Sequence, residues 1–479
     1  MSEQSAAPKL TLFDVTNLVI GAIIGADIYV ASSFGAAYLG PSSLIVWVAA
    51  GVIAIVIALC FAQCAAYLPR VGGPYAYAKD AWGPFPGFIV GWSLWLAEWI
   101  SLAVFPVAFV RYLTFFQPSL DPLIQALVKV LFVAFLIVNN VLGVKAAGRT
   151  NDILTIIKLA PLILFVIIGA GYSLLNPATV TSNLTPFAPF GYTSFGLTLV
   201  LVFWAYAGFE ISTIPADVVE NPSKIIPRAI VLGMTIVTVF YLTTNTVLFA
   251  VRSSPQLATD LAPLATATVS ILGTGSILAI LGGLVVSVGA LISVTGSDES
   301  GMIGTSRLGY ALAVDGLFPK IFAKIHPKYK TPYLAIIVQA VTALIASLIG
   351  NLGTLVAVSV FFLAVAYAAT CASILSFRRR DPEPVFHLRG GAILPIIGVV
   401  FSLYLITQCT TPQLEIGLVL LGVGVPMYVI FTPKKELTLL KEELLAPRAM
   451  QEERLMQSER FLAHALTHLR KLIVSRSKD

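Results

Sequence analysis

Long apolar segments recur along the whole chain, and short polar segments separate them. A helix needs about 20 apolar residues to cross the hydrocarbon core of a bilayer. By that measure the pattern predicts about twelve membrane-spanning helices, centred near residues 24, 55, 100, 133, 163, 202, 240, 286, 342, 364, 401 and 422. We therefore expect an all-α integral membrane protein that is embedded over most of its length.

The composition and the absence of catalytic motifs exclude other classes of protein, namely soluble domains and enzymes. Of the 479 residues, 57% are hydrophobic and 11% are charged, whereas soluble domains carry about 25% charged residues. The chain has no H-E-x-x-H zinc motif, no G-x-S-x-G nucleophile motif and no phosphate-binding loop. His464 and His468 are spaced four residues apart, but no Cys or acidic ligand stands beside them. We expect no enzymatic activity, no metal, no cofactor and no nucleic-acid partner.

Lys and Arg predict the orientation, because cytoplasmic loops are enriched in these residues. If the N-terminus is cytoplasmic, the opposite side holds little beyond Arg111 and Arg252. The cytoplasmic loops then hold Arg70, Lys79, Lys145, Arg149, Lys224, Arg228, Arg307, Lys320, Lys324, Lys328, Lys330, Arg378, Arg379, Arg380 and Arg389. We expect a multi-pass protein of the cell membrane with both termini in the cytoplasm.

The ends of the chain differ from the transmembrane domain, which we place at residues 11–432. Residues 1–10 form a short cytoplasmic segment. Residues 433–479 are charged, and apolar side chains recur there near helical spacing, which predicts an amphipathic helical tail. This tail either lies on the inner leaflet, pairs with itself or packs on the transmembrane domain.

Two of the expected spans are interrupted at corresponding places, Gly21–Asp27 and Phe203–Glu210. Each interruption is a patch of small residues that ends in a carboxylate. Unwinding a helix frees N–H and C=O groups that lipid cannot satisfy, so the gaps persist only where a ligand, an ion or a neighbouring side chain completes them. Paired gaps of this kind are typical of inverted-repeat carriers that bind their solute near the bilayer midplane.

Five motifs along the chain resemble those of the amino acid–polyamine–organocation superfamily of secondary transporters. They are GAIIGADI (21–28), the segment with LPRVGGPYAYAKDAWGPFPGFIVGW (within 65–92), NNVLGVKAAGRTNDILTIIKLAPL (139–162), FWAYAGFE (203–210) with ENPSKIIPRAI (220–230), and TSRLGYALAVDGLFPKIFAKIHPKYKTP (305–332). Their order also matches the family, and the resemblance runs from about residue 10 to about residue 430.

The resemblance implies a fold of two inverted five-helix repeats followed by two further helices, with the first and sixth helices discontinuous. The first repeat would cover about residues 11–175, and the second repeat would cover about residues 192–379. The last two helices would then lie at about residues 391–432.

The resemblance also implies a substrate site between the two gaps. The backbone at Ile24, Gly25 and Ala26 would face a substrate carboxylate, and the carbonyl groups near Ala205 and Tyr206 would accept its ammonium group. Phe209 or Tyr206 would serve as an aromatic gate. The complete expected substrate-binding set is Ile24, Gly25, Ala26, Asp27, Ala205, Tyr206, Ala207 and Phe209.

Asp27 departs from the family, which usually has glycine at this position. In one interpretation Asp27 only caps the free N–H groups of the outer half-helix. In the other, its carboxylate occupies the place of the substrate carboxylate, so that the ligand is a cation or a transported proton. The two interpretations are compatible, since a cap at this position also displaces the anion of a substrate.

Lys158 and Glu299 are the expected coupling residues. In proton-coupled relatives a lysine in the fifth span replaces a bound sodium ion, and Lys158 matches that position. A buried amine releases its proton more readily than one in water, which suits a group that loads and unloads a proton. The alternative is that Lys158 is a static counter-ion for Asp27 or Glu299.

Three further acids fall within the apolar segments, Glu98, Glu210 and Asp298. Acids within a membrane are functional hypotheses by default. We interpret Glu98 first as a polar tie between helices and second as a substrate-facing residue, and we place Asp298 near the inner mouth.

We therefore predict a secondary active transporter of a small amino acid or related zwitterion, proton-coupled or exchanging. The alternative is a carrier of cationic amines, such as polyamines or decarboxylated amino acids, in which Asp27 replaces the substrate carboxylate. A lesser alternative is a sensor that signals through residues 433–479. The expected partners are lipid, the small-molecule substrate and a proton; the oligomeric state stays open.

Overall fold

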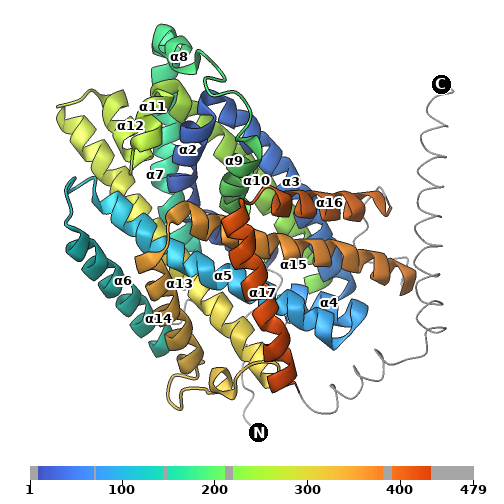
Figure 1. The fold of residues 1–479 in the computed structure, drawn as a ribbon. Coiled ribbons are helices and arrows are strands. Elements are labelled where there is room, and N and C mark those ends of the chain that lie inside the picture. Colours follow the sequence, from blue (N-terminus) through green and yellow to red (C-terminus); the bar gives the residue numbers. More distant parts are fainter. Residues whose placement is uncertain (1–8, 70–71, 144–147, 211–218, 381–390, 433–479) are drawn as a thin grey trace, which may run out of the picture.

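A computed structural model describes residues 9–69, 72–143, 148–210, 219–380 and 391–432, with side chains from residue 158 onward in the segment that begins at 148. Within these ranges the chain is helical, and its only strand-like pairing is an isolated bridge between Leu10 and Val219. The helices pack into one bundle (Figure 1). The expected N-terminal segment lies almost wholly outside the described residues, and the expected amphipathic tail does so entirely.

The first span is divided into two helices, α1 (Leu12–Ile23) and α2 (Asp27–Tyr38), which are bent by 43° at the break. A capping box between Thr11 and Asp14 begins α1, because the two side chains satisfy free N–H groups of the first turn. The break at residues 24–26 lies in the patch of small residues that the sequence predicts as a gap.

The sixth span is also broken. Helix α9 (Phe195–Phe203) passes into a single 3-10 turn, η2 (Trp204–Tyr206), and Ala207 is then extended with φ −72° and ψ 158°. Gly208 follows with φ +120°, a conformation that only glycine adopts without strain. The structure thus confirms a discontinuous sixth helix up to Glu210, after which residues 211–218 are not described.

Ten further helices complete the transmembrane domain. They are α3 (Ser43–Tyr67), α5 (Pro84–Leu113), α6 (Pro122–Leu142), α7 (Gly148–Leu175), α10 (Pro222–Val251), α13 (Ile277–Val314), α14 (Tyr333–Ile349), α15 (Leu352–Arg380), α16 (Ile393–Thr407) and α17 (Thr411–Phe431). Eight helices of the described part are long and apolar enough to cross a membrane, and the bent pair α1–α2 adds a ninth span. With the shorter apolar helices α14 and α16 and the segment Phe195–Tyr206, the expected set of about twelve is confirmed.

Short helices connect these spans. They are η1 (Gly40–Ser42), α4 (Pro74–Trp82), α8 (Pro177–Leu184), α11 (Ser254–Thr259), α12 (Pro263–Leu272) and η5 (Lys320–Ala323). Helices α8, α11 and α12 lie together at one end of the bundle, at the top of Figure 1.

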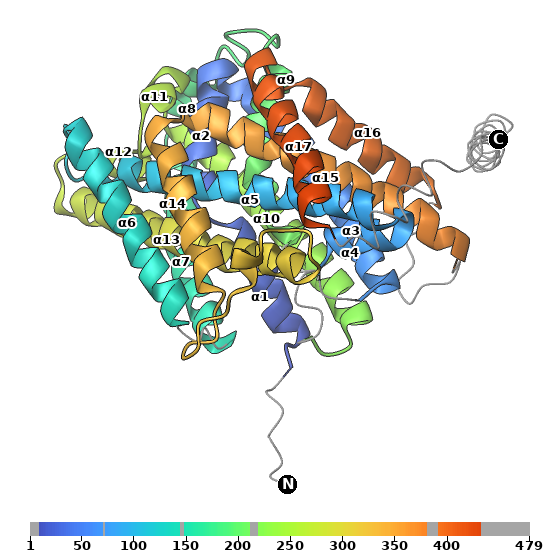
Figure 2. The same cartoon turned by 60° about the horizontal axis from the view of Figure 1, so that its bottom comes forward.

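The centre and the periphery of the bundle differ in burial. The most apolar windows of α5 and α15 are 78% and 72% buried, whereas those of α6 and α17 are only 17% buried. Both views show α5 and α15 crossing the middle of the molecule while α6 runs along one side (Figures 1 and 2). The central helices can therefore carry polar side chains into a protein-lined interior, and the peripheral ones present apolar side chains to lipid.

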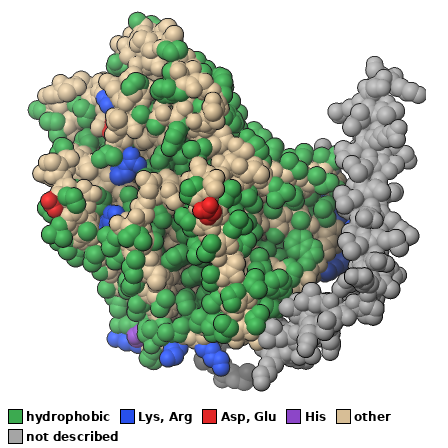
Figure 3. Space-filling model, viewed as in Figure 1, with side chains coloured by type: hydrophobic (Ala, Val, Ile, Leu, Met, Phe, Trp, Pro, Cys, Tyr) green, Lys and Arg blue, Asp and Glu red, His purple; other side chains and the backbone are tan. Residues whose placement is uncertain are grey.

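Charged side chains are sparse on the visible surface. Figure 3 shows a face made mostly of hydrophobic side chains and backbone, with several Lys and Arg side chains along the lower edge, where the connection between α13 and α14 lies in Figure 1, and a few others on the left side. An apolar belt with a basic end is typical of a membrane-embedded protein. The division into two repeats stays a prediction.

Candidate functional site

The two broken spans touch each other at their breaks. A Cβ atom added at Gly208 would lie 2.8 Å from the carbonyl oxygen of Ala22 and 3.1 Å from the backbone nitrogen of Ile23. Glycine is therefore required at position 208 both for its positive φ and for this close backbone approach. The contact brings residues nearly two hundred positions apart in sequence to the middle of the bundle.

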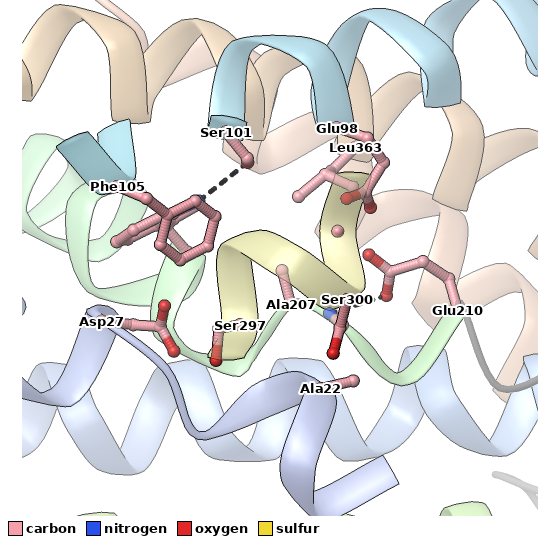
Figure 4. A pocket seen from close by; sticks show the side chains of 13 residues that line it. Ala22, Asp27, Glu98, Ser101, Phe105, Ala207, Glu210, Ser297, Ser300 and Leu363 are labelled. Carbon is pink, nitrogen blue, oxygen red and sulfur yellow. Dashed lines mark hydrogen bonds between the residues drawn. The ribbon is translucent and has the colours of Figure 1, made fainter. Parts of the chain in front are cut away.

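A cavity lies beside this contact. Five elements line it: the first and sixth breaks together with α5, α13 and α15. Figure 4 shows Asp27 at one end, Glu98 and Glu210 at the other, and small side chains between them. The lining residues are Ala22, Asp27, Glu98, Ser101, Phe105, Trp204, Ala207, Gly208, Glu210, Ser297, Ser300, Gly301 and Leu363.

The carbonyl end of α1 is completed by neighbouring side chains. Ser297 on α13 donates from Oγ to the Ile24 carbonyl oxygen at 3.3 Å, and Ser293 lies 3.5 Å from the carbonyl oxygen of Gly25. Tyr241 on α10 donates to the carbonyl oxygen of Ile23 at 3.2 Å. The freed carbonyl groups are thus satisfied within the protein, as burial in a membrane requires.

Lys158 lies at the same carbonyl end. Its Nζ donates to the carbonyl oxygen of Gly21 at 3.4 Å and to Ser297 Oγ at 3.2 Å, and the side chain is 4% exposed. A helix C-terminus favours a cation, so the ammonium group occupies a site that suits positive charge. The arrangement is compatible with both interpretations of Lys158, the coupling group and the static counter-ion.

Asp27 lies at the opposite side of the break, as the first residue of α2. Its carboxylate faces the Tyr241 hydroxyl at 3.4 Å and interacts with the backbone N–H groups of Gly25 and of Asp27 itself. A helix N-terminus favours an anion. A built-in carboxylate therefore interacts with one of the backbone groups, that of Gly25, which the resemblance assigns to a substrate carboxylate.

Glu98 and Glu210 lie together at the other end of the cavity. Glu98 comes from the middle of α5 and is half-buried, and Glu210 follows the extended residues of the sixth break and is fully buried. Glu210 Oε2 accepts a hydrogen bond from the N–H of Gly208 at 3.0 Å. Both expected acids therefore reach the site.

The two expected gate residues are not part of the cavity wall. Tyr206 donates from its hydroxyl to the carbonyl oxygen of Trp47 on α3 at 3.0 Å. Phe209 packs edge-on against Phe61 of α3, with ring centroids 5.2 Å apart. The aromatic side chain of the break that reaches the cavity is Trp204, whose Nε1 donates to Ser101 Oγ at 3.1 Å.

Of the remaining expected residues, only Ala207 lies on the cavity wall. Ile24, Gly25 and Ala26 are buried in the break, and Ala205 lies in the η2 turn, while Ala207 reaches the wall. Glu299 on α13 interacts electrostatically with Lys158. Ile24, Gly25 and Ala26 thus lie at the break of the first span, and Glu299 lies near Lys158.

Asp298 stands apart from this cluster. Its side chain is 1% exposed, and neither carboxylate oxygen has a hydrogen-bond partner among the described residues. It does not line the cavity. The structure therefore does not bring Asp298 together with the other expected site residues.

Several lining residues carry no sequence signal of their own. Ser101 lies three positions after the suspected Glu98 on α5, so helical spacing from a suspected residue is a signal that could have found it. Ser297 and Ser300 flank the suspected Asp298 and Glu299 on α13. Phe105, Gly301 and Leu363 are apolar or small residues in apolar helices, and nothing in the sequence separates them from lipid-facing neighbours. Among the described residues, no group of three or more His, Cys, Asp or Glu side chains is arranged to hold a metal ion.

Comparison with known proteins places the whole transmembrane domain in one group. Residues 10–431 match the amino acid permease family. The branched-chain amino acid permease BcaP of Bacillus subtilis is 29% identical over 460 residues, which cover 90% of this chain and 94% of the relative. The methylthioribose transporter of the same organism is 28% identical, covering 91% and 95%. Its serine/threonine exchanger SteT is 27% identical, covering 87% and 95%.

Proposed function

Because this chain belongs to the amino acid permease family, we propose that it moves small amino acids across the cell membrane as a secondary transporter with alternating access. The observation that carries the proposal is the contact between Gly208 and Ala22, which joins two broken spans beside one buried cavity. Such breaks hold a solute at the centre of a carrier, and rocking of the surrounding helices then opens the site to either side. The chain is a multi-pass membrane transporter and not an enzyme.

The relatives support an amino acid as the solute class. Two of those described above are named for branched-chain amino acids and for serine and threonine, and a third is named for methylthioribose. The third name means that similarity of this degree does not select the solute. The choice of an amino acid therefore depends on the groups that line the cavity.

An ammonium group fits the cavity. The η2 turn ends the outer half of the sixth span at Tyr206, so its last carbonyl groups present the negative end of a helix dipole. Three carboxyl groups, from Asp27, Glu98 and Glu210, line the cavity, and no Lys, Arg or His is among the lining residues that the structure describes. This excess of acids favours a solute with a positive group.

Coupling to a proton is the second part of the proposal. Lys158 binds the carbonyl end of α1 and Ser297 of α13. When its proton leaves, the ammonium–carbonyl interaction is lost, and the packing of α7 against α1 and α13 changes. Titration of one amine thereby shifts the equilibrium between the two orientations of the cavity.

The distribution of Lys and Arg supports a cytoplasmic location for both termini. The described basic side chains between α13 and α14 lie at the end of the bundle that is opposite to α8, α11 and α12 (Figures 1 and 3). The cell membrane is the proposed location.

A cationic amine is the second candidate solute, because the Asp27 carboxyl group lines the cavity and interacts with the backbone of Gly25. A substrate carboxylate at this position would meet the Asp27 carboxylate, and like charges repel strongly in a site of low dielectric. A solute without a carboxylate avoids that repulsion.

Counterflow in liposomes tests both candidates. Liposomes that contain the purified protein are preloaded with unlabelled serine or lysine, and uptake of the same labelled amino acid is measured. In parallel, liposomes are preloaded with ethanolamine or cadaverine, and uptake of the same labelled amine is measured. An amino acid carrier exchanges the amino acids and ignores the amines, and the second candidate reverses this order. Absence of counterflow for a full panel of amino acids and amines, in protein that remains folded, would overturn the proposed function.

The variant Asp27→Gly sharpens this comparison. If Asp27 holds the anion site, its removal should raise the preference for the amino acid over its amine by about tenfold, since one charge-assisted contact is worth roughly that factor. Asp298→Asn is the matched control, because it also removes a buried acid but lies outside the cavity wall. An equal change in both variants would remove Asp27 from substrate selection.

A further inference from the structure

The connection between α13 and α14 carries several lysines and no acid. We call residues 316–332 the basic loop. Its lysines are Lys320, Lys324, Lys328 and Lys330, and all four are exposed. The sequence has no Asp or Glu between positions 316 and 349. Figure 3 shows Lys and Arg side chains along the edge of the molecule where this connection lies in Figure 1. The basic loop is therefore a surface of a single charge sign.

The charges of the basic loop are not neutralised by the part of the protein that the structure describes. The ion pairs of the described residues involve Lys79, Arg252 and Arg380, so none of the four lysines has an acidic partner there. The acid that directly precedes the loop, Asp315, binds Lys79 at 2.9 Å. The ammonium groups of the loop are thus left for an anionic partner from outside the chain.

Buried aromatic side chains hold the basic loop against the bundle. Phe318 and Phe322 are buried and contact Trp95 of α5, with ring centroids 5.2 Å and 6.0 Å from that of the indole. At the end of the loop, Thr331 Oγ1 donates to the carbonyl oxygen of Val141 on α6 at 2.8 Å. Because the loop is fastened at both ends, its lysines lose little backbone freedom when they bind a partner.

A histidine orders the second half of the basic loop. His326 Nδ1 accepts hydrogen bonds from the backbone N–H groups of Lys328 and Tyr329, each at 3.2 Å. The N–H of Lys330 donates to the carbonyl oxygen of His326 at 2.9 Å. This tight turn fixes the backbone at Lys328 and Lys330, so the two lysines are presented from a fixed position.

The apolar neighbours of the lysines indicate a lipid as the partner. Ile321 and Ile325 directly follow Lys320 and Lys324, and they are 41% and 39% exposed. The loop begins just after α13 ends and stops where α14 begins, so it lies at the level where apolar helices leave the bilayer. At this level apolar side chains enter the acyl region, while the ammonium groups of lysines reach the phosphate groups.

We propose that the basic loop binds the headgroups of anionic phospholipids. The four lysines bind the phosphate oxygens, and Ile321 and Ile325 lie among the adjoining acyl chains. Clusters of four or more basic residues beside a membrane span are typical of anionic-lipid binding, because each lysine gains free energy near a negatively charged surface. In the proposed orientation these lipids belong to the inner leaflet, and only that assignment rests on the proposed function.

Fluorescence quenching by labelled lipids tests this binding without any solute. A fluorophore is attached to Val314→Cys, because Val314 ends α13 beside the loop and is 59% exposed, whereas the four native cysteines are free and buried. In liposomes that mix phosphatidylcholine and phosphatidylglycerol, one lipid at a time is brominated. Stronger quenching by brominated phosphatidylglycerol at equal mole fraction is expected. Equal quenching by the two lipids would overturn the proposal.

Two double variants separate the basic loop from general surface charge. Lys320→Gln with Lys324→Gln removes two charges from the loop, and Lys224→Gln with Arg228→Gln removes two exposed charges from the start of α10. The first variant should lower the preference for phosphatidylglycerol by at least about fivefold, the scale of one lysine beside an anionic surface. The second should keep the preference. An equal loss in both would indicate diffuse attraction and overturn the site.

A charge-conserving variant controls for damage to the loop. Lys320→Arg with Lys324→Arg keeps both positive charges, so the preference for phosphatidylglycerol should stay as in the wild type. If this variant loses the preference as fully as the glutamine variant does, recognition by charge is wrong.

Inorganic phosphate distinguishes a lipid headgroup from a soluble anion. Compared with chloride at the same ionic strength, phosphate should leave the quenching unchanged, because it has no acyl chain for Ile321 and Ile325 to contact. Displacement of phosphatidylglycerol by phosphate, beyond the chloride control, would assign the lysines to a soluble anion instead of a lipid.

These readouts are independent of the proposed function. Quenching needs no transported solute, so it remains decisive even if the counterflow panel gives no uptake. Conversely, solute counterflow together with equal quenching by the two lipids would overturn the lipid-binding surface and leave the transporter intact.

Discussion

At the residue scale, Lys158 lies where positive charge is favoured, between the carbonyl oxygen of Gly21 at 3.4 Å and Ser297 Oγ at 3.2 Å. If this amine carries the coupled proton, uptake should rise as the external pH falls. We expect Lys158→Ala to abolish this dependence and to lower gradient-driven accumulation by about tenfold, because alanine cannot carry the proton. Uptake of the solute found by the counterflow panel, measured in liposomes with and without a pH gradient, checks this.

Lys129→Ala is the matched control for Lys158. Lys129 also lies in an apolar helix, α6, but it donates to the carbonyl oxygen of Ser347 at 2.7 Å, away from the breaks. The control should keep the response to the pH gradient. An unchanged response in Lys158→Ala would leave this lysine with a static role.

At the scale of elements, the contact between the two breaks makes position 208 intolerant of any side chain. Gly208→Ala places a Cβ 2.8 Å from the Ala22 carbonyl oxygen and forces a residue with a side chain to adopt a φ of +120°, at a cost of about 1–2 kcal/mol for the backbone alone. We expect transport to fall by at least about tenfold while the helices still insert, because lipid-facing packing is unchanged. Counterflow per folded molecule measures this loss.

Gly171→Ala serves as the comparison for Gly208. Gly171 lies in α7, and nothing stands within 4 Å of an added Cβ. Alanine favours a helix over glycine by about 0.5–1 kcal/mol, so transport should be kept and thermal stability should rise slightly. Wild-type transport in Gly208→Ala would mean that the breaks do not work as a tightly packed unit.

At the scale of the whole molecule, an apolar belt and a basic end predict one orientation in the membrane. Lys328 and Ser182 are both exposed; Lys328 lies in the connection between α13 and α14 and Ser182 lies in α8, and these two elements are at opposite ends of the bundle (Figure 1). In intact cells, a membrane-impermeant maleimide should label Ser182→Cys and should label Lys328→Cys only after the membrane is opened. The native cysteines, which are free and buried, should give little background.

The unsubstituted chain, labelled before and after permeabilisation, is the control for this orientation. Labelling of Lys328→Cys in intact cells with protection of Ser182→Cys would reverse the orientation and place the termini outside. Labelling of both positions at once would indicate that the population inserts in two orientations.

Sequence alone located the breaks because glycines and acids interrupt otherwise apolar segments, and such interruptions are costly in lipid. Asp27, Glu98 and Glu210, all suspected from the sequence, reach the cavity. The sequence did not predict which aromatic residue of the sixth break faces the cavity. Trp204 faces the cavity whereas Tyr206 turns toward α3, because a tight 3-10 turn and the extended residue Ala207 set the direction of each side chain.

What the sequence determined by itself was the class of the protein: membrane-spanning length, apolar composition, the two gaps and the family motifs are all local properties of the chain. Only the tertiary structure decided which groups meet. Glu98 approaches Glu210 at one end of the cavity, and Lys158 donates a hydrogen bond to the end of α1; both contacts join elements that are distant in sequence. Such pairings depend on the rotation and crossing of packed helices, which hydrophobicity does not encode because every face of a central helix is buried.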